Sequence, residues 1–276
     1  MRIKEAAPAL GAYISNFSIK EISDSLDARN EISALLSKYG VLFFRDQRVT
    51  AYELSEFAKY FGKIEGHPAY PTVQGVPEVQ ILESTKDRPS KIELWHSDMS
   101  FRPNPPIITI LHAQILPREG GDTLWASAEA AYESLDAYTK KRIEHLVAVH
   151  EFEYGFRESI NEPGGAERLA LAISQHPAVE HSVVKKHPVT GRKLLFVNPL
   201  FTSKLLGNDA TASRALLKEL CARIVSDDFV VRLKWEVNTV AMWDNRSTQH
   251  KPVNDFFPEH RKMHRITVLN DKREKR

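Results

Sequence analysis

The strongest constraint on the fold comes from a histidine and a carboxylate two residues apart, His96 and Asp98. If this segment is extended, both side chains point the same way, because side chains on a strand alternate with a period of two. An imidazole and a carboxylate that converge on one point usually bind a metal ion. Two ligands are too few for a stable site, so the fold must bring a third ligand from elsewhere in the chain.

A third candidate ligand, His250, follows a predicted strand at 240–243 and lies 152 residues beyond Asp98. The interior of a β-sandwich can bring together two ligands from one strand and a third from a distant strand. Two histidines and one carboxylate on one face of a metal leave the opposite positions open, which suits non-haem Fe(II) that activates dioxygen. The same set suits a catalytic zinc, so these residues alone leave the metal open.

Hydrophobic patterns along the chain predict several short strands and a few helices. Strands are predicted near 12–20, 41–44, 79–82, 107–116, 123–125, 193–197, 229–235, 240–243 and 265–269. Helices are predicted near 25–39, after a capping box formed by Thr50 and Glu53, over 127–149, and over about 210–225. These elements predict a mainly β fold, an antiparallel sandwich with helical decoration, in one domain over 1–276. Residues 152–180 show no clean period and predict an excursion that can serve as a lid.

Composition and charge argue against several classes of partner. The formal net charge of +2 lacks the basic footprint expected of a nucleic-acid-binding protein. No stretch approaches the roughly 18 apolar residues needed to span a bilayer, and the N-terminus lacks the apolar run of a signal peptide. A single cysteine, Cys221, cannot form a disulfide within the chain, which fits a reducing compartment. We therefore expect a cytoplasmic protein with neither nucleic acid nor membrane as partner.

Two arginines near the C-terminus narrow the chemistry. If residues 261–265 continue into a strand, the guanidiniums of Arg261 and Arg265 point to the same face as the three candidate ligands. Arginine clamps carboxylates and sulfonates bidentately, so two arginines beside a metal imply an anionic reactant. Thr123, which follows a Gly-Gly-Asp turn, can add a hydroxyl to the same anion.

Together these residues resemble the taurine/α-ketoglutarate dioxygenase family over nearly the whole chain. The blocks that carry the resemblance are Trp95-His96-Ser97-Asp98, Gly120-Gly121-Asp122-Thr123-Leu124-Trp125 and Trp243-Asp244-Asn245-Arg246, followed by His250, Arg261 and Arg265. The resemblance implies a double-stranded β-helix (jelly-roll) core, Fe(II), and 2-oxoglutarate as co-substrate. It also implies dioxygen as a reactant and a dimer or tetramer as the assembly.

The resemblance further implies roles for individual residues. His96, Asp98 and His250 match the iron ligands of the family. Thr123 and Arg261 match the residues that bind the distal carboxylate of 2-oxoglutarate. No further catalytic residue is implied beyond the metal ligands.

The substrate pocket implied by the resemblance is built from five residues. Arg265 matches the arginine shared between the anionic head of the substrate and the inner carboxylate of 2-oxoglutarate. His67 matches the residue at the sulfonate, and Tyr70 the residue near the amine end. Phe156 and Phe201 match the aromatic walls. Tyr70 and Phe156 are equally consistent with a packing role.

The activity implied by the resemblance is hydroxylation of a small, taurine-like sulfonate at the carbon next to sulfur, with release of sulfite, an aldehyde, succinate and CO2. One position departs from the taurine enzymes. They place an asparagine three residues ahead of the Trp of the Trp-His-x-Asp block, and this chain has Ile92 there. An apolar side chain cannot hydrogen-bond an ammonium, and an unpaired polar group in a pocket costs about 1–3 kcal/mol. The anion-binding half of the pocket is thus predicted more firmly than the amine-binding half.

Two alternatives remain open from the sequence. The same chemistry could act on an alkyl sulfate ester or an aryloxyalkanoate, whose anionic head Arg265 could also hold. The chain could instead be a non-catalytic jelly-roll protein that binds a metal or an anion. The open-sided ligand set together with two arginines argues for an enzyme, since a pure binding protein has no need of both.

Overall fold

The long apolar run at 107–116 forms a central strand of the largest sheet, as its pattern predicts. This strand, β7 (Ile108–Ile115), is buried over its first six residues and pairs antiparallel with β15 (Val240–Asp244) and β17 (Arg261–Leu269). The computed structural model describes residues 1–65 and 70–269. Within them the largest sheet has nine strands, and β7 lies near its middle.

The remaining strands of this sheet lie on both sides of the central three. In spatial order the sheet runs β1 (Arg2–Glu5), β2 (Ala12–Ser15), β3 (Val41–Phe44), β15, β7, β17, β6 (Val76–Ser84) and β5 (Thr72–Val73), with β4 (Lys63–Glu65) also paired to β17. Its pairings are antiparallel except that β2 runs parallel to β3.

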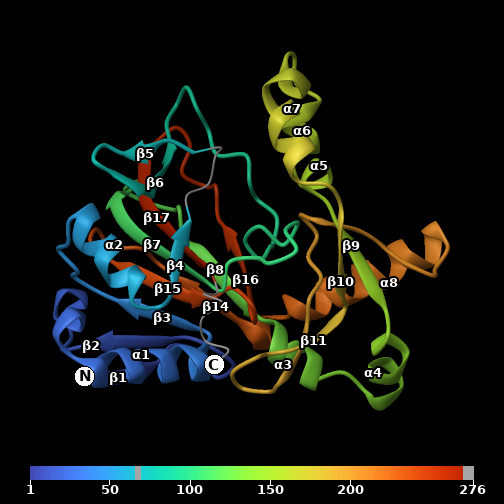
Figure 1. Cartoon of the computed structure of the whole chain (residues 1–276), viewed down its shortest axis with the longest axis horizontal. Helices are drawn as coiled ribbons and strands as arrows, with labels where there is room; N and C mark the ends of the chain where they lie inside the picture. The colour runs from blue at the N-terminus through green and yellow to red at the C-terminus, as the bar shows by residue number, and fades with distance from the viewer. Residues whose placement is uncertain (66–69, 270–276) are drawn as a thin grey trace.

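A second sheet packs against the inner face of the first. Its strands lie in the order β14 (Val230–Leu233), β8 (Thr123–Ser127) and β16 (Thr248–Pro252), all antiparallel. Side chains from both sheets interdigitate in one buried cluster, which includes Phe43, Leu111, Trp125, Leu233 and Trp243. These two facing sheets form the jelly-roll core, and the predicted fold class is confirmed (Figure 1).

Helices cover the outer face of the large sheet. The 3-10 helix η1 (Ile19–Asp24) leads into α1 (Leu26–Tyr39), which ends at Gly40 with a φ of 70°, and α2 (Ala51–Lys59) follows β3. Figure 1 shows α1 and α2 on one side of the sandwich. They bury a cluster against the sheet that includes Ile32, Leu36, Leu54, Phe57 and Ile266.

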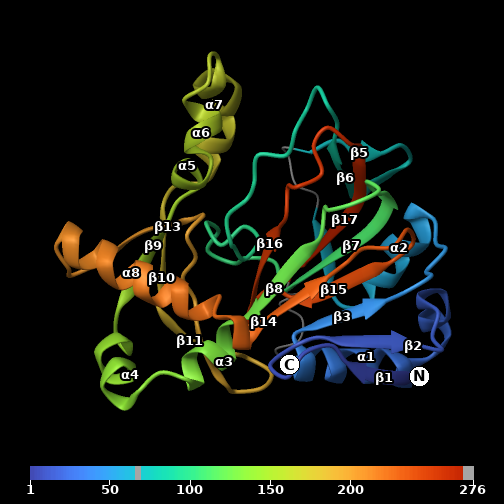
Figure 2. The same cartoon turned by 180° about the vertical axis from the view of Figure 1, so that it is seen from behind.

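The middle of the chain forms a second body beside the sandwich. It contains the helices α3 (Ala128–Glu133), α4 (Ala137–Ile143) and α8 (Ala210–Ile224), the 3-10 helix η2 (Asp227–Phe229), a sheet of β10 (Val179–Ser182), β9 (Val147–His150) and β13 (Thr202–Leu205), and the pair β11 (Val184–Lys186) and β12 (Lys193–Leu195). A further segment, α5 (Phe152–Gly155), α6 (Arg157–Ile160) and α7 (Gly165–Gln175), projects from this body as an arm (Figure 2).

The predicted helix over 127–149 is wrong. The helix stops after Glu133, and the Asp136 side chain accepts a hydrogen bond from the Thr139 backbone N–H, which caps a new helix. Aspartate competes with the helix for backbone donors in this way, so it favours a helix start over a helix interior. The last residues of the range, Val147–His150, pair with β10 and β13, which suits the β-branched Val147 and Val149.

No apolar helix of membrane-spanning length occurs among residues 1–65 and 70–269.

The capping box predicted at Thr50 is confirmed. The Glu53 backbone N–H donates to Thr50 Oγ1 at 3.2 Å, and the Thr50 backbone N–H donates to Glu53 Oε2 at 2.7 Å. These bonds satisfy backbone donors that the first turn of a helix leaves unpaired.

We expect Thr50→Ala to lower the free energy of unfolding by about 1 kcal/mol, because the cap loses its acceptor and α2 frays over the sheet. Urea denaturation at pH 7 measures the change. Thr50→Ser keeps the hydroxyl and serves as the matched control, which should stay within about 0.5 kcal/mol of the native protein. Equal losses in the two variants would contradict the capping role.

Candidate metal centre and active-site cavity

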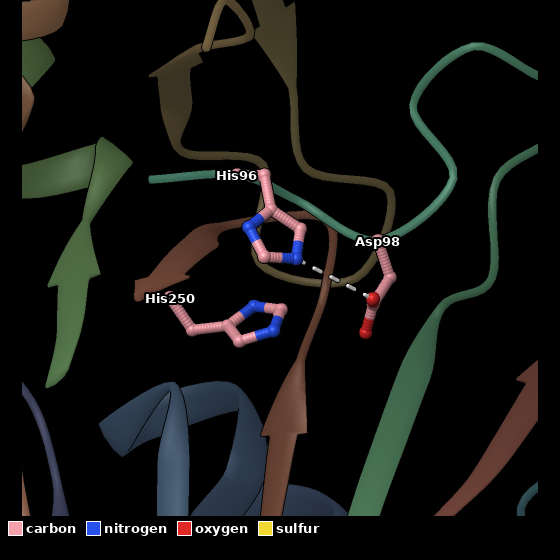
Figure 3. A group of neighbouring side chains, drawn as sticks. All are labelled: His96, Asp98 and His250. Atoms are coloured by element: carbon pink, nitrogen blue, oxygen red, sulfur yellow. Dashed lines mark ion pairs between the residues drawn. The ribbon is translucent and has the colours of Figure 1, made fainter. Parts of the chain in front are cut away.

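Three side chains predicted as metal ligands converge at one end of the sandwich. One ligand atom from each of His96, Asp98 and His250 lies within 4.8 Å of the others, and all three residues are buried. His250 belongs to β16, whereas His96 and Asp98 lie in the segment between β6 and β7. Figure 3 shows the two imidazoles and the carboxylate pointing toward a common centre.

Backbone hydrogen bonds hold the two histidines in register. The His96 N–H donates to the His250 carbonyl at 3.0 Å, and the His250 N–H donates to the His96 carbonyl at 2.8 Å. This isolated bridge extends the pairing of β16 by one residue on an otherwise irregular segment. The ligand segment is therefore fixed to the small sheet, although His96 and His250 are far apart in sequence.

The ring of His96 has a defined tautomer. Its Nδ1 lies 2.9 Å from the Leu94 carbonyl, which can only accept, so Nδ1 carries the proton. The lone pair of Nε2 then faces Asp98 Oδ1, 3.9 Å away. Hydrogen bonding of the second ring nitrogen is how proteins usually orient a metal-bound histidine.

Three side chains fix Asp98 through four hydrogen bonds. Thr109 Oγ1 donates to Oδ2 at 2.7 Å, and Arg265 Nη2 donates to Oδ1 at 2.7 Å. The side chain of Asn245 clamps the backbone, since its Oδ1 accepts from the Asp98 N–H at 2.7 Å and its Nδ2 donates to the Asp98 carbonyl at 2.9 Å. Asn245 also donates to the Pro106 carbonyl at 2.9 Å.

Neither Thr109 nor Asn245 is among the residues predicted for the site. For Thr109 the sequence does offer a signal, a threonine within an apolar strand, because a buried hydroxyl needs a partner. Asn245 lies inside the Trp-Asp-Asn-Arg block, but its neighbours in sequence do not reveal what its amide contacts.

The electrostatics of the triad favour the protonation states that a metal requires. Burial alone would raise the pKa of Asp98, but the charge of Arg265, the imidazoles and the Thr109 hydrogen bond outweigh it and hold that pKa well below its usual value. Burial lowers the pKa of His250 to about 3 and also lowers the pKa of His96. Two neutral imidazoles and one carboxylate are ready-made ligands for a divalent metal, so the residues fit the ion.

The two predicted arginines both face the site from β17. Arg265 is buried and touches Asp98, and its Nε has no hydrogen-bond partner among the described residues. Arg261 is half-buried, and its Nε donates to the Gly121 carbonyl at 3.1 Å. Burial lowers the pKa of Arg261 to about 10, and Asp122 opposes this shift. Both guanidiniums favour anions beside the triad.

A cavity of about 960 Å³ opens from the triad. The predicted site residues among those that line it are Tyr70, His96, Asp98, Thr123, Phe156, His250, Arg261 and Arg265. Phe201 lies behind this surface, edge-on to His96 at 6.1 Å between ring centroids, and its neighbour Leu200 lines the cavity. His67 lies outside the described residues.

One wall of the cavity is apolar. Ile92 and Phe156 line it and pack on a buried cluster with Phe101, Phe152 and Phe201. The backbone carbonyl of Ile92 accepts a hydrogen bond from Asn254 Nδ2 at 3.0 Å. The Ile92 backbone is therefore fixed by a contact that does not involve its side chain.

A buried polar cluster lies behind the ligand segment. Ser100 Oγ is 3.0 Å from His150 Nδ1 and accepts from Asn198 Nδ2 at 2.9 Å, and His150 Nε2 is 3.2 Å from Thr202 Oγ1. Burial, together with the neighbouring His181 and Lys185, lowers the pKa of His150 to about 3. His150 is therefore neutral in the folded protein.

The chain is similar in sequence to a known protein family and to several of its members. Residues 2–267 match the family described as "Taurine catabolism dioxygenase TauD, TfdA family". The chain is 36% identical to a protein of Acinetobacter baylyi described as an alkylsulfatase, over 98% of this chain and 86% of that protein. It is 32% identical to an α-ketoglutarate-dependent sulfate ester dioxygenase of Pseudomonas putida, over 98% of this chain and 89% of that protein.

Solved structures show the same likeness. A crystal structure described as a taurine dioxygenase from Burkholderia xenovorans superposes with a TM-score of 0.83 at 30% sequence identity. The superposition covers 98% of this chain and 89% of the other. The sequence and fold likenesses therefore extend over the same part of the chain.

We expect Asn245→Ala to weaken metal binding about tenfold, because the Asp98 backbone loses its clamp and second contacts of metal ligands typically contribute this much. The free energy of unfolding should fall by about 2 kcal/mol, because a buried N–H is left unpaired. Calorimetric titration with Mn(II) and urea denaturation measure the two effects. Asn208→Ala is the control, because its amide donates to the Leu206 carbonyl at 3.3 Å in an exposed bend far in sequence from the ligands. Native metal affinity in Asn245→Ala would refute the clamp.

We expect the metal-free protein to lose stability below pH 6.5. His150 binds a proton near pH 6.5 when unfolded but only near pH 3 when folded, so the unfolded state holds more protons between these values. Stability therefore falls as pH falls, by about 2 kcal/mol from this residue between pH 7 and pH 5. Urea denaturation at pH 7, 6 and 5 should show a shallower fall in His150→Gln. His145→Gln, which replaces an exposed histidine, should match the native pH dependence. An unchanged dependence in His150→Gln would contradict this account.

Proposed function

The chain belongs to the TauD/TfdA family of dioxygenases, and on this basis we propose that it oxidises an alkyl sulfate ester or alkyl sulfonate with an apolar chain. It is a 2-oxoglutarate-dependent dioxygenase that uses Fe(II). The observation that carries the substrate proposal is Arg265, a buried guanidinium that lines the cavity beside the triad. A buried arginine whose Nε has no partner within residues 1–65 and 70–269 is suited to an anionic head group.

The opposite end of the proposed substrate is apolar because the cavity wall is apolar. Ile92 and Phe156 offer no hydrogen bond, so the ammonium of taurine would be desolvated without a partner beside them. The cavity is also bordered by four carboxylates, all exposed to solvent: Glu83, Asp87, Glu93 and Glu158. Exposed carboxylates hold a cation only weakly. A volume of about 960 Å³ leaves room for a chain longer than that of taurine.

In the proposed reaction, separate groups of residues bind the metal, the co-substrate and the substrate. His96, Asp98 and His250 would hold the iron, and Thr123 and Arg261 would bind the distal carboxylate of 2-oxoglutarate. Arg265 would hold the substrate anion next to the inner carboxylate. When bound, iron and 2-oxoglutarate supply the oxidation, in which the co-substrate loses CO2 to become succinate as a substrate C–H bond is hydroxylated.

The position of the anion determines which carbon is oxidised. With the head group on Arg265, the carbon next to the sulfonate, or next to the ester oxygen of a sulfate, lies toward the triad. Hydroxylation of that carbon places a hydroxyl and a leaving group on one atom. The C–S or C–O bond then breaks and the hydroxyl proton is lost, which leaves an aldehyde with sulfite from a sulfonate or sulfate from an ester.

Residues 152–180 supply part of the cover over this chemistry. Phe156 and Arg157 line the cavity from the arm, and Glu162 pairs with Lys91 on the segment that leads to the ligands. We propose that this contact closes the cavity and limits access of water. An apolar, closed site protects a reactive oxidant from side reactions.

We expect the native enzyme to form aldehyde and succinate from hexyl sulfate or hexanesulfonate with a kcat/KM at least about tenfold above that for taurine, because an unpaired ammonium costs about 1–3 kcal/mol. The release of sulfate or of sulfite identifies which ester or sulfonate is used. Ile92→Asn should raise kcat/KM for taurine and lower it for the hexyl compounds. Ile92→Val, which keeps the wall apolar, is the matched control.

Two outcomes would count against this proposal. Equal or better turnover of taurine by the native enzyme would overturn the apolar chain. Turnover of aryloxyalkanoates without turnover of any sulfate or sulfonate would overturn the sulfur oxyanion. Succinate formation is scored in every case, since it reports the shared chemistry.

A further inference from the structure

The hydroxyl of Thr123 is hydrogen-bonded to a tryptophan that the reaction scheme above does not use. The indole Nε1–H of Trp235 donates to Thr123 Oγ1 at 2.9 Å, and both side chains are buried. Trp235 follows β14, and Leu233 at the end of that strand lies opposite Thr123 in the β14–β8 register. The sheet pairing thus places the indole against the first residue of β8.

This bond sets the direction in which the Thr123 hydroxyl can act. An indole N–H only donates, and a hydroxyl has one hydrogen and two lone pairs. When Trp235 occupies a lone pair of Oγ1, the hydroxyl hydrogen remains free to donate elsewhere. Thr123 lines the cavity, and a carboxylate is an acceptor only. Trp235 therefore prepares Thr123 as a donor toward an anion.

The same indole lies beside Arg261, the second residue proposed to bind the distal carboxylate. The guanidinium carbon of Arg261 is 6.0 Å from the Trp235 ring and 6.0 Å from the Phe256 ring. The Arg261 Nε is meanwhile held by the Gly121 carbonyl. One aromatic side chain thus contacts both groups proposed to bind the distal carboxylate, the first through a hydrogen bond and the second through its ring face.

Packing alone does not explain the hydrogen bond. Trp125 and Trp243 share the buried cluster with Trp235, and their Nε1 atoms have no hydrogen-bond partner among the residues that the structure describes. The cluster therefore accepts buried indoles without pairing them. The bond from Trp235 to Thr123 is a specific feature of the end of the cluster that meets the cavity.

We propose that Trp235 is a positioning residue for the co-substrate, which acts through Thr123 and selects 2-oxo acids with a distal carboxylate. This inference rests on the proposed function, in which Thr123 and Arg261 bind that carboxylate. It assigns the preference for 2-oxoglutarate over shorter or uncharged 2-oxo acids to a residue outside the motif blocks.

The test compares two co-substrates that differ only at the far end. Dissociation constants for 2-oxoglutarate and 2-oxovalerate, which has a methyl in place of the distal carboxylate, are measured anaerobically by calorimetry with Fe(II). Trp235→Phe keeps an aromatic ring, although a smaller one, and removes the N–H. We expect a roughly 3- to 10-fold weaker affinity for 2-oxoglutarate and a change of less than about twofold for 2-oxovalerate. In turnover, KM for 2-oxoglutarate should rise while kcat is retained.

A double-mutant cycle separates positioning from packing. Thr123→Val removes the hydroxyl and should weaken 2-oxoglutarate about tenfold. Adding Trp235→Phe to Thr123→Val should change the affinity by less than about twofold, because the indole no longer has a hydroxyl to orient.

Three results would overturn the inference: native 2-oxoglutarate affinity in Trp235→Phe, equal losses for both acids, or additive losses in the double variant. No binding of 2-oxoglutarate by the native protein would instead overturn the proposed function, and the inference with it. The two failures are therefore distinguishable, because the native protein is measured first.

Discussion

The site depends on the Asp98 carboxylate, which stays ionised although it is buried. Asp98 is buried, and an isolated buried carboxylate would take up a proton rather than remain ionised. Arg265, Thr109 and the backbone clamp of Asn245 make the charged form the stable one. Removing one partner of such a buried pair leaves an uncompensated charge, which typically costs 3–5 kcal/mol. The same contacts therefore stabilise the fold and prepare a metal ligand.

The architecture explains how these partners meet. The large sheet supplies Thr109 and Arg265, the small sheet supplies Thr123 and His250, and the segment between β6 and β7 supplies the remaining two ligands. The site therefore straddles two sheets whose separation is set by the aromatic cluster between them. Because catalysis by positioning is sensitive to shifts of about 1 Å, packing deep in this cluster bears directly on the chemistry.

Some of these features were open to prediction from the sequence because their signals are local or belong to motifs. The capping box at Thr50 depends on residues three apart, and the strand at 107–116 depends on one apolar run. The grouping of His96, Asp98 and His250 was predictable from the family blocks, whereas the period-two argument assumed a strand that is absent, since His96 forms an isolated bridge and Asp98 lies in a turn. Arg261 and Arg265 share a face because they are four residues apart on a strand.

Other features depend on partners that only the fold brings together. Asn245 clamps a residue 147 positions away, and Trp235 meets Thr123 across 112 positions, so neither role has a local signal. The prediction of one helix over 127–149 was wrong for a different reason. Its apolar spacing is helical, but Asp136 starts a new helix and the last four residues find strand partners. Tertiary pairing here outweighs local periodicity.

The two ends of the cavity differ in how freely they can change during evolution. Arg265 pairs with the buried Asp98 and is also the residue proposed to bind the substrate anion, so a substitution of Arg265 that altered the choice of head group would also leave a metal-ligand candidate unpaired. The backbone carbonyl of Ile92 accepts a hydrogen bond from Asn254, and the side chain of Ile92 forms part of the cavity wall. That side chain packs on the cluster of Phe101, Phe152 and Phe201, which is separate from the cluster between the two sheets. Under the proposed function, enzymes built on this plan should therefore diversify at the tail of the substrate, while the negative charge of the head group stays constant.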